Sequence, residues 1–219
     1  TTTENPSFSV TRQLLQIANL PVHVASIESN DEQADANRAL AIVAGEHRSI
    51  AAVLTGLQQL DRAGRIDGTI PDVALMRQMA DYLRQFPTRL HHPKEEHYLF
   101  DRLARRTGEV ADLIASLEQE HRDGTQLIEE IEASLESARG DATQRAELAD
   151  VIERFAESQW RHLSAEEKLI LPAARQHLDE ADWQAIADAF RQNVSVRIGG
   201  EQDEAFKRLF VKLMNTAPA

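Results

Sequence analysis

Two short stretches carry the same histidine–glutamate spacing, and this repeat constrains the fold more than any other feature of the chain. His91 is followed four residues later by Glu95, and His162 is followed four residues later by Glu166. In a helix this spacing puts the imidazole and the carboxylate on one face, a turn apart. Because each pair leads into an apolar run, the repeat predicts two helices that offer nitrogen and oxygen ligands to a shared metal site.

The composition excludes thiolate metal sites and disfavours nucleic-acid partners. The 219 residues contain no cysteine, so a metal must be held by histidine and carboxylate side chains. Lys and Arg number 24 against 36 Asp and Glu, a formal charge of -12, and the sequence has no basic cluster that could follow a phosphate backbone. We therefore expect no nucleic-acid partner. The sequence has no secretory leader pattern and no run of 18 apolar residues, so we also expect no membrane association and a cytoplasmic location.

Apolar residues recur three and four positions apart along four segments, the pattern of a helix with one buried face. The segments run from about Asp35, from Asp72 to about Arg106, from about Gly108 to Ala138, and from an N-cap at Asp141 to about His177. The short turns between them predict an all-α fold, an up-down-up-down four-helix bundle. In this interpretation residues 1–34 are an N-terminal arm, 35–178 the bundle, and 179–219 a C-terminal helical extension.

Three predicted helices carry a histidine in their apolar stripe, namely His47, His121 and His162, and the second helix carries His91 close to its stripe. Counted from the intervening turns at about 1.5 Å per residue, these histidines fall within roughly one helical turn of the same height. A buried polar group costs several kcal/mol unless it is paired or bound to a metal. With Glu95 and Glu166 as carboxylates able to bridge, the layer predicts a dinuclear iron or manganese centre.

The register of the second helix stays open. The apolar stripe that precedes the motif, if it continued unbroken, would leave His91 one residue out of phase. Pro87 and Pro93 each remove a backbone donor, and a kink or a single-turn bulge there would shift the phase by about one residue. The alternatives are His91 with Glu95, which we favour, and His92 with Glu96.

One short motif in each predicted helix surrounds these residues. The motifs are Glu46-His47-Arg48, residues 86–96, residues 120–124, and residues 162–172. In combination they resemble the hemerythrin family in its bacterial cation-binding (HHE) branch. The resemblance implies a four-helix bundle with a non-haem di-iron site and an oxo or hydroxo bridge. It implies that His47 and His91 hold one iron, that His121 and His162 hold the other, and that Glu95 and Glu166 bridge them.

The sequence departs from the oxygen-carrying hemerythrins at Leu117, where the resemblance would place another histidine. One metal would then be more open, as in iron-sulfur-cluster repair proteins and other four-histidine members. The first hypothesis is a protein that binds dioxygen, nitric oxide or a related small ligand for sensing or redox response. The alternatives are a di-iron oxidase, peroxidase or nitric-oxide-scavenging enzyme that uses oxygen or peroxide, and an iron donation or repair protein.

A few other residues carry expectations of their own. Gly124 would allow close approach of a neighbouring helix or a ligand. Tyr98 is expected in the core and His97 in solvent, while His177 would interact with a helix C-terminus. The amphipathic stretch at 201–215 must dock on the bundle or on a second copy, and a homodimer through this helix is expected.

Overall fold

The computed structural model describes residues 31–67, 72–137 and 142–199. Residues 1–30 of the expected N-terminal arm, the N-cap at Asp141 and the amphipathic stretch at 201–215 lie outside the described residues. The expected homodimer contact therefore lies outside them as well.

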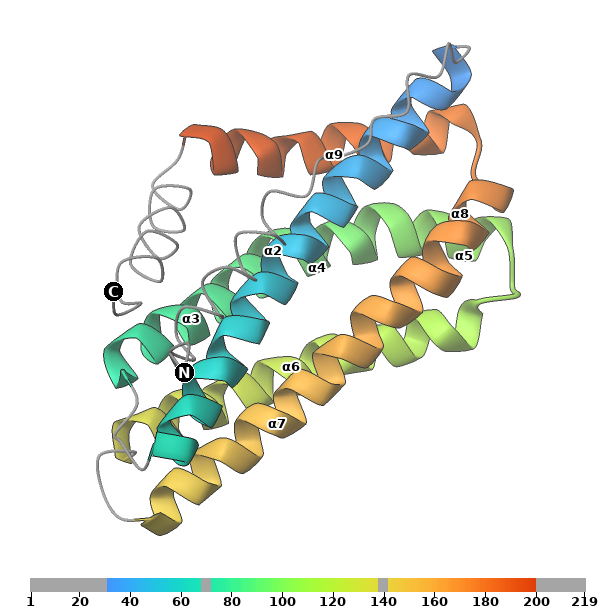
Figure 1. Ribbon diagram of the computed structural model, residues 1–219. Helices are drawn as coiled ribbons and strands as arrows, with labels where there is room; N and C mark the ends of the chain where they lie inside the picture. Colours follow the sequence, from blue (N-terminus) through green and yellow to red (C-terminus); the bar gives the residue numbers. More distant parts are fainter. Residues whose placement is uncertain (1–30, 68–71, 138–141, 200–219) are drawn as a thin grey trace, which may run out of the picture.

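The described residues form five helical rods (Figure 1). The first is α2 (Asp31–Asp67), and the second contains α3 (Val73–Phe86), η1 (Pro87–His91), α4 (His92–Lys94), η2 (Glu95–Phe100) and α5 (Asp101–Arg106), where η marks a π-helical turn. The third is α6 (Ala111–Ser137), the fourth contains α7 (Ala142–Ala165), η3 (Glu166–Ile170) and α8 (Leu171–His177), and the fifth is α9 (Glu180–Gly199). All regular structure in these ranges is helical, which confirms the predicted all-α bundle.

Local chemistry explains where the second rod begins and ends. The Asp72 side chain accepts a hydrogen bond from the Leu75 N–H at 2.9 Å, an N-cap that stabilises the first turn of α3 by about 1 kcal/mol. At the other end Thr107 adopts an extended conformation, and its hydroxyl accepts from the Glu109 N–H at 3.1 Å. This tight connection reverses the chain, so that α6 runs back beside the second rod (Figure 1).

Two apolar clusters fill the bundle and leave a polar layer between them. The lower cluster consists of buried residues from 50–57, 73–86, 128–135 and 148–163. The upper cluster consists of buried residues from 36–43, 99–103, 114–117 and 170–190. On each of the first four rods a predicted ligand histidine lies between or at the edge of the two clusters, which places all of these histidines at similar height. We call this level the polar layer.

The helix α9 belongs to the upper cluster. Trp183, Ile186 and Phe190 are buried there beside residues of α2, and α9 lies across the upper part of α2 (Figure 1). The first helix of the expected C-terminal extension therefore packs on the bundle, and it runs to Gly199.

One stretch of α2, Ala34–Ile66, is long and apolar enough to cross a membrane by length and composition alone. Half of its most apolar window is buried inside the protein, as is usual for a helix in a bundle core. The same stretch carries His47 in the polar layer, so its apolar character is explained by packing. Nothing else in the described residues points to a membrane protein.

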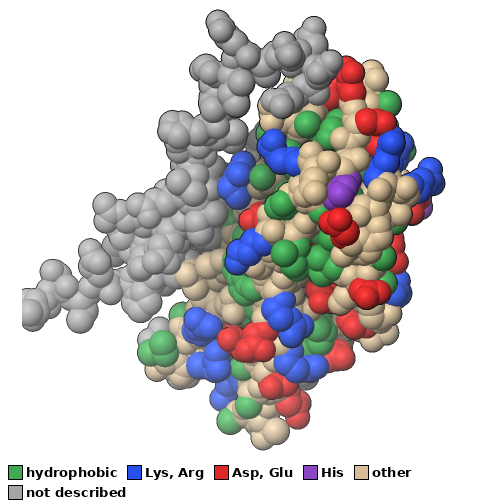
Figure 2. Space-filling view, turned by 90° about the vertical axis from the view of Figure 1, so that its right-hand side faces the viewer, with side chains coloured by type: hydrophobic (Ala, Val, Ile, Leu, Met, Phe, Trp, Pro, Cys, Tyr) green, Lys and Arg blue, Asp and Glu red, His purple; other side chains and the backbone are tan. Residues whose placement is uncertain are grey.

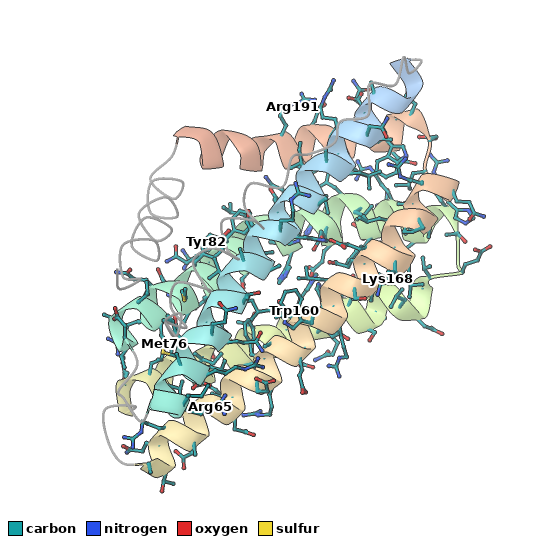
Figure 3. All side chains as sticks on the ribbon, in the orientation of Figure 1. Arg65, Met76, Tyr82, Trp160, Lys168 and Arg191 are labelled. Atoms are coloured by element: carbon teal, nitrogen blue, oxygen red, sulfur yellow. The ribbon has the colours of Figure 1, made fainter. Side chains whose placement is uncertain are left out.

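The surface of the bundle mixes charges of both signs. Figure 2 shows acidic and basic side chains interspersed over one face. Between rods, Arg84 pairs with Glu132 at 2.9 Å. Trp160 of α7 points toward α2, where its Nε1–H donates to the side-chain oxygen of Gln58 at 3.4 Å (Figure 3). These contacts tie the rods together outside the polar layer.

Candidate metal centre

Three π-helical turns lie at the level of the polar layer, η1 and η2 on the second rod and η3 on the fourth. Pro87 opens η1, Pro93 comes just before η2, and Pro172 follows η3. Proline has no backbone N–H, so the usual hydrogen-bond ladder is interrupted at these positions. The turns widen instead, and the N–H of His92, for example, donates to the carbonyl of Pro87, five residues back. The bulge expected from the two prolines of the second rod is present.

Candidate ligand atoms gather at two places in the polar layer. The first position is formed by His47, His91, Glu95 and Glu166, and the second position by His92, Glu95, His121 and His162. Within each position one ligand atom per residue lies within 4.8 Å of every other, and all of these residues are buried. The structure therefore brings the six sequence-predicted site residues together, and it adds His92. Because Glu95 belongs to both, the two positions lie side by side.

The first position draws its atoms from three rods. His47 Nε2 lies 3.4 Å from Glu95 Oε1 and 3.4 Å from Glu166 Oε2. His91 Nε2 lies 3.1 Å from the same Glu95 oxygen. The two imidazole rings meet edge to face with centroids 5.0 Å apart. Two nitrogens and two carboxylates thus converge on one point.

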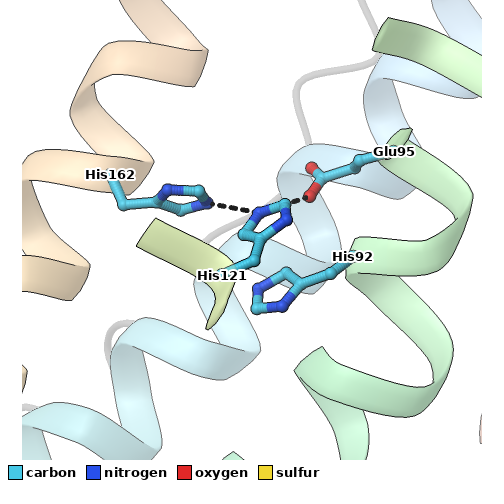
Figure 4. A group of neighbouring side chains, drawn as sticks. All are labelled: His92, Glu95, His121 and His162. Atoms are coloured by element: carbon cyan, nitrogen blue, oxygen red, sulfur yellow. Dashed lines mark hydrogen bonds and ion pairs between the residues drawn. The ribbon is translucent and has the colours of Figure 1, made fainter. Parts of the chain in front are cut away.

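The second position holds three imidazoles (Figure 4). His121 Nε2 lies 3.0 Å from His162 Nε2 and 3.8 Å from Glu95 Oε2. His92 lies flat against His121, with ring centroids 3.7 Å apart and planes 7° apart. His162 Nε2 lies 3.4 Å from Glu166 Oε1. Since its other oxygen faces His47, Glu166 faces both positions in the same way as Glu95.

The two registers of the second rod are not alternatives in the structure. His91 enters the first position and His92 the second. Glu95 is the carboxylate that both share, whereas Glu96 bonds the outer ring nitrogen of His121. Two consecutive side chains of an α-helix point about 100° apart. Such a pair therefore suits two neighbouring centres better than one. The adjacent histidines could thus have predicted that both are ligands, one at each position.

Leu117 lies one turn before His121 and is buried in the upper cluster. It offers no ligand atom to the second position, in agreement with the departure noted from the sequence. His92 brings an imidazole to the second position from the neighbouring rod. The number of histidines around the two positions is therefore five rather than four.

The remaining ring nitrogens of four site histidines are bonded to carboxylates outside the six predicted site residues. Of these carboxylates, Glu96 was expected only as the alternative to Glu95. These Nδ1 contacts are His47 to Glu167 at 3.2 Å, His91 to Glu46 at 2.8 Å, His121 to Glu96 at 2.7 Å, and His162 to Glu120 at 3.2 Å. When Nδ1–H donates to a carboxylate, the lone pair of Nε2 is free to face a metal. In each of the four rods this directs Nε2 into the polar layer.

The unsatisfied atoms of the layer match what a cation would bind. Within the described residues, His91 Nε2, Glu95 Oε2 and both carboxylate oxygens of Glu166 are buried without a hydrogen-bond partner. Each such atom costs about 1–3 kcal/mol when it is left unpaired. The Nε2 atoms of His121 and His162 lie 3.0 Å apart, so that one proton or one cation can lie between them. A pair of divalent cations would satisfy all of these atoms, so the residues fit a dinuclear centre.

The first position favours positive charge. Burial lowers the pKa of His47, but hydrogen bonds to Glu167 and Glu95 outweigh it and raise the pKa to about 9. Burial also opposes protonation of His91, yet the charge of Glu95 and a hydrogen bond to Glu46 raise its pKa well above the usual value. At neutral pH, protons therefore take the place of a cation between these carboxylates.

The second position is closer to neutral. Burial lowers the pKa of His121 to about 4. Burial, reinforced by the neighbouring His121, also brings the pKa of His92 well below its usual value. For His162 the effect of burial is outweighed by Glu166, and its pKa is raised. Two of the three imidazoles are thus uncharged at neutral pH, the form in which imidazole binds a metal.

Aromatic rings enclose both positions. Phe86 stacks beside His91 with ring centroids 6.3 Å apart, and Phe190 of α9 meets the same imidazole edge to face at 6.2 Å. Phe100 stacks beside His121 at 6.1 Å. All three phenylalanines are buried. Apolar rings therefore flank His91 and His121, and their low polarity strengthens electrostatic interactions beside them.

Gly124 allows close approach, as expected. A Cβ at this position would lie 3.1 Å from the side-chain nitrogen of Gln159 on α7. Gln159 is buried, one turn before His162. The glycine therefore lets α6 and α7 approach each other just below the second position.

Three side chains outside the layer test the remaining expectations. His97 is exposed, as expected, with Nδ1 2.8 Å from the Pro93 carbonyl. His177 lies in the last turn of α8, with Nε2 3.5 Å from Glu109. The expectation that Tyr98 packs in the core is wrong. Its side chain is 37% exposed, and the Arg102 guanidinium lies over the ring at 5.3 Å, because the wide turn of η2 directs Tyr98 outward.

Comparison with known proteins gives the family. Residues 38–174 match the sequence model of the hemerythrin HHE cation-binding domain. Curated relatives include uncharacterized proteins of Mycobacterium bovis and of two strains of Mycobacterium tuberculosis, each 24% identical over 155 residues. The similar stretch covers 70% of this chain and 60% of each relative, so the chain spans less than two thirds of their length. The matched range is more than half of the chain and contains both positions of the polar layer, and the chain belongs to the hemerythrin HHE cation-binding family.

Proposed function

We propose that the protein is a non-haem di-iron protein that binds dioxygen, nitric oxide or a related small ligand for sensing or redox response. The observation that carries the proposal is the sharing of Glu95 and Glu166 between two neighbouring groups of imidazoles. A carboxylate with one oxygen toward each group is the arrangement that bridges two cations. Imidazole and bridging carboxylate ligands without sulfur favour iron or manganese.

The proposed ligands are the six sequence-predicted residues together with His92. The first position would use two nitrogens, from His47 and His91, and the second position three. The two glutamates would contribute one oxygen to each position. The first position thus has fewer protein ligands, and we propose it as the place where an external ligand binds. A reduced iron pair would supply electrons and an open coordination site for a diatomic molecule or peroxide.

The surroundings support a small ligand rather than a large substrate. Phe86, Phe190 and the buried carboxylate of Glu46 surround His91 of the first position. Bulky buried neighbours of this kind favour a molecule of two or three heavy atoms over a large substrate. The proposed compartment is the cytoplasm, in line with the one apolar stretch of membrane-spanning length being half buried in the bundle within the described residues.

The proposal is tested by loading the purified chain with ferrous salt under anaerobic conditions and then mixing it with oxygen or nitric oxide. We expect two irons per chain and a visible absorption band that forms on mixing and reverses when the gas is removed. His97→Ala, which removes an exposed histidine of the same rod, should behave like the wild type. A chain that takes up no iron would contradict the proposal.

The same experiment separates the alternatives. A band that decays rapidly while an added reductant is consumed would favour an oxidase, peroxidase or nitric-oxide-scavenging enzyme. Iron that exchanges readily with a chelator would favour iron donation or repair. The third imidazole at the second position favours ligand binding over the enzymatic alternatives. It fills the coordination position that Leu117 would otherwise leave open.

A further inference from the structure

Four sequence doublets occupy the polar layer, and each has one member that faces the centre and one that reaches a neighbouring rod. The doublets are Glu46-His47, Glu95-Glu96, Glu120-His121 and Glu166-Glu167. The inward members are two histidines and two glutamates that belong to the two positions. The outward members are all glutamates, and each bonds the Nδ1 of a histidine on a different rod.

These bonds connect the rods in a closed order. Glu46 of the first rod holds His91 of the second, and Glu96 of the second rod holds His121 of the third. Glu120 of the third rod holds His162 of the fourth, and Glu167 of the fourth rod holds His47 of the first, which closes the circuit.

We propose that Glu46, Glu96, Glu120 and Glu167 form a ring of positioning carboxylates, in which each rod orients the histidine that the next rod offers to a cation. The inference rests on the proposed function in one respect, namely that these histidines bind metal. A carboxylate on Nδ1 fixes the tautomer and the plane of the ring, and it raises the basicity of the ligating nitrogen. Because every bond crosses from one rod to another, the ring also fixes the relative height of the four histidines before any cation arrives.

The four bonds of this ring differ in burial. The Glu46 side chain is 0% exposed, and its partner His91 is almost fully buried. Glu120 and Glu96 are 26% and 32% exposed, and Glu167 is 51% exposed. Charged hydrogen bonds weaken as water and salt reach them. The contribution of the four carboxylates should therefore decrease from Glu46 to Glu167.

His92 stands outside the ring. Within the described residues its ring–ring contacts are with other imidazoles, and the closest is the parallel stacking on His121. Its orientation therefore depends on His121, which Glu96 holds in place. Loss of Glu96 should disturb two imidazoles of the second position instead of one.

The test compares Glu46→Gln and Glu120→Gln with Glu132→Gln. Glu132 is a matched control because it is 32% exposed and bonds Arg84 between two rods, outside the polar layer. The first readout is the nitrogen chemical shifts of the histidine rings in the metal-free protein. The second is the affinity for cobalt(II), followed by its visible absorption bands. Neither readout depends on reactivity of an iron-loaded protein.

In the metal-free wild type we expect a proton on Nδ1 of His47, His91, His121 and His162. Glu46→Gln should change the ring shifts of His91 and weaken cobalt binding at the first position by about 10–100-fold. Glu120→Gln should do the same to His162 and the second position, and Glu132→Gln should change neither readout. Unchanged ring shifts and affinity in both Glu46→Gln and Glu120→Gln would overturn the inference.

Two further outcomes keep the inference separate from the proposed function. If Glu46→Gln does not fold, Glu120→Gln and Glu167→Gln test the inference in its place. Glu120 and Glu167 are more exposed, and these variants remove the same kind of bond near the surface. A wild type with the four Nδ1 protons but no affinity for ferrous iron would leave the ring standing and refute the di-iron function. A wild type that binds two irons while the ring variants match Glu132→Gln would refute the ring and leave the di-iron function standing.

Discussion

The first and second positions lie side by side in one polar layer and share two glutamates, yet they differ in charge and in ligands. The first has two imidazoles that are positively charged at neutral pH, because the pKa of His47 is raised to about 9 and that of His91 well above its usual value. The second has three, of which His121 has a pKa lowered to about 4. At His121 burial and the neighbouring His162 and His91 lower the pKa. At His47 the hydrogen bonds to Glu167 and Glu95 outweigh burial. One bundle can thus build two unlike cation sites from the same pair of residue types.

The largest effect is expected from Glu95→Ala, because Glu95 belongs to both positions. Removal of the shared carboxylate should abolish binding of the cation pair, so that metal analysis after gel filtration finds less than one iron per chain. Glu132→Gln, which removes a carboxylate outside the polar layer, should keep the wild-type iron content. Retention of the full iron content by Glu95→Ala would show that this carboxylate does not bridge.

A change confined to the second position sharpens the comparison. His92→Ala removes the third imidazole there, and we expect cobalt affinity at that position to fall by more than about 100-fold, beyond the loss typical of an outer partner. The first position should keep its affinity. His97→Ala is the matched control, because His97 is an exposed histidine of the same rod. Equal cobalt titrations for the two variants would mean that His92 is not a ligand.

The two positions should respond differently to pH. A cation entering the first position must displace the proton of His47, whose pKa is about 9, and that of His91, whose pKa is also raised. Affinity there should fall about tenfold per pH unit for each proton displaced as the pH decreases below 9. At the second position His162, with a raised pKa, adds the dependence of one proton, and His121, with a pKa of about 4, adds none above pH 6. Cobalt titrations at pH 6, 7 and 8 check this, and identical pH slopes for both positions would contradict it.

The same raised pKa predicts how the metal-free fold depends on pH. A group whose pKa is higher in the folded than in the unfolded chain stabilises the fold below the unfolded value. For His47 this stabilisation is fully present below about pH 6.5 and is lost as the pH rises through about 9. Urea unfolding of the metal-free chain should therefore show a decreasing free energy of unfolding over this interval. An increase would contradict the charge assigned to the first position.

The smallest effect is expected from Gly124→Ala. The added Cβ would lie 3.1 Å from the Gln159 side-chain nitrogen, which must move by a few tenths of an ångström. Alanine gains about 1 kcal/mol of helix propensity over glycine, so the two effects should nearly cancel in thermal unfolding. Gly108→Ala is the control, since nothing lies within 4 Å of a Cβ there. A large loss of stability only in Gly124→Ala would mean that α6 and α7 cannot adjust to the added Cβ.

The fold could be predicted from the sequence because the apolar stripes are long and the turns between them short. The inward direction of His47, His121 and His162 followed directly, since each continues the apolar stripe of its own helix. The docking of α9 could not be predicted, because an amphipathic helix does not specify which surface it covers. Phe190 and Trp183 show in the structure that this surface is α2 and the upper cluster.

The candidate site was only partly accessible to sequence reasoning. Helical periodicity assumes one residue every 100°, and the π turns of the second rod break that assumption at the site itself. For this reason His91 and His92 looked like alternatives, and Glu96 looked like a replacement for Glu95. The outer carboxylates could not be assigned to their histidine partners for another reason. Their partners lie on other rods, and a single sequence does not give the relative rotation of two helices.

The central claim is that one layer of the bundle holds two cations in unlike positions that share two glutamates. Mössbauer spectroscopy of the chain loaded with ⁵⁷Fe and oxidised, combined with iron and protein analysis, tests it most directly. The account predicts two irons per chain in two spectral components of equal area, magnetically coupled to each other. A single uncoupled iron, or a chain that folds and binds none, would contradict it.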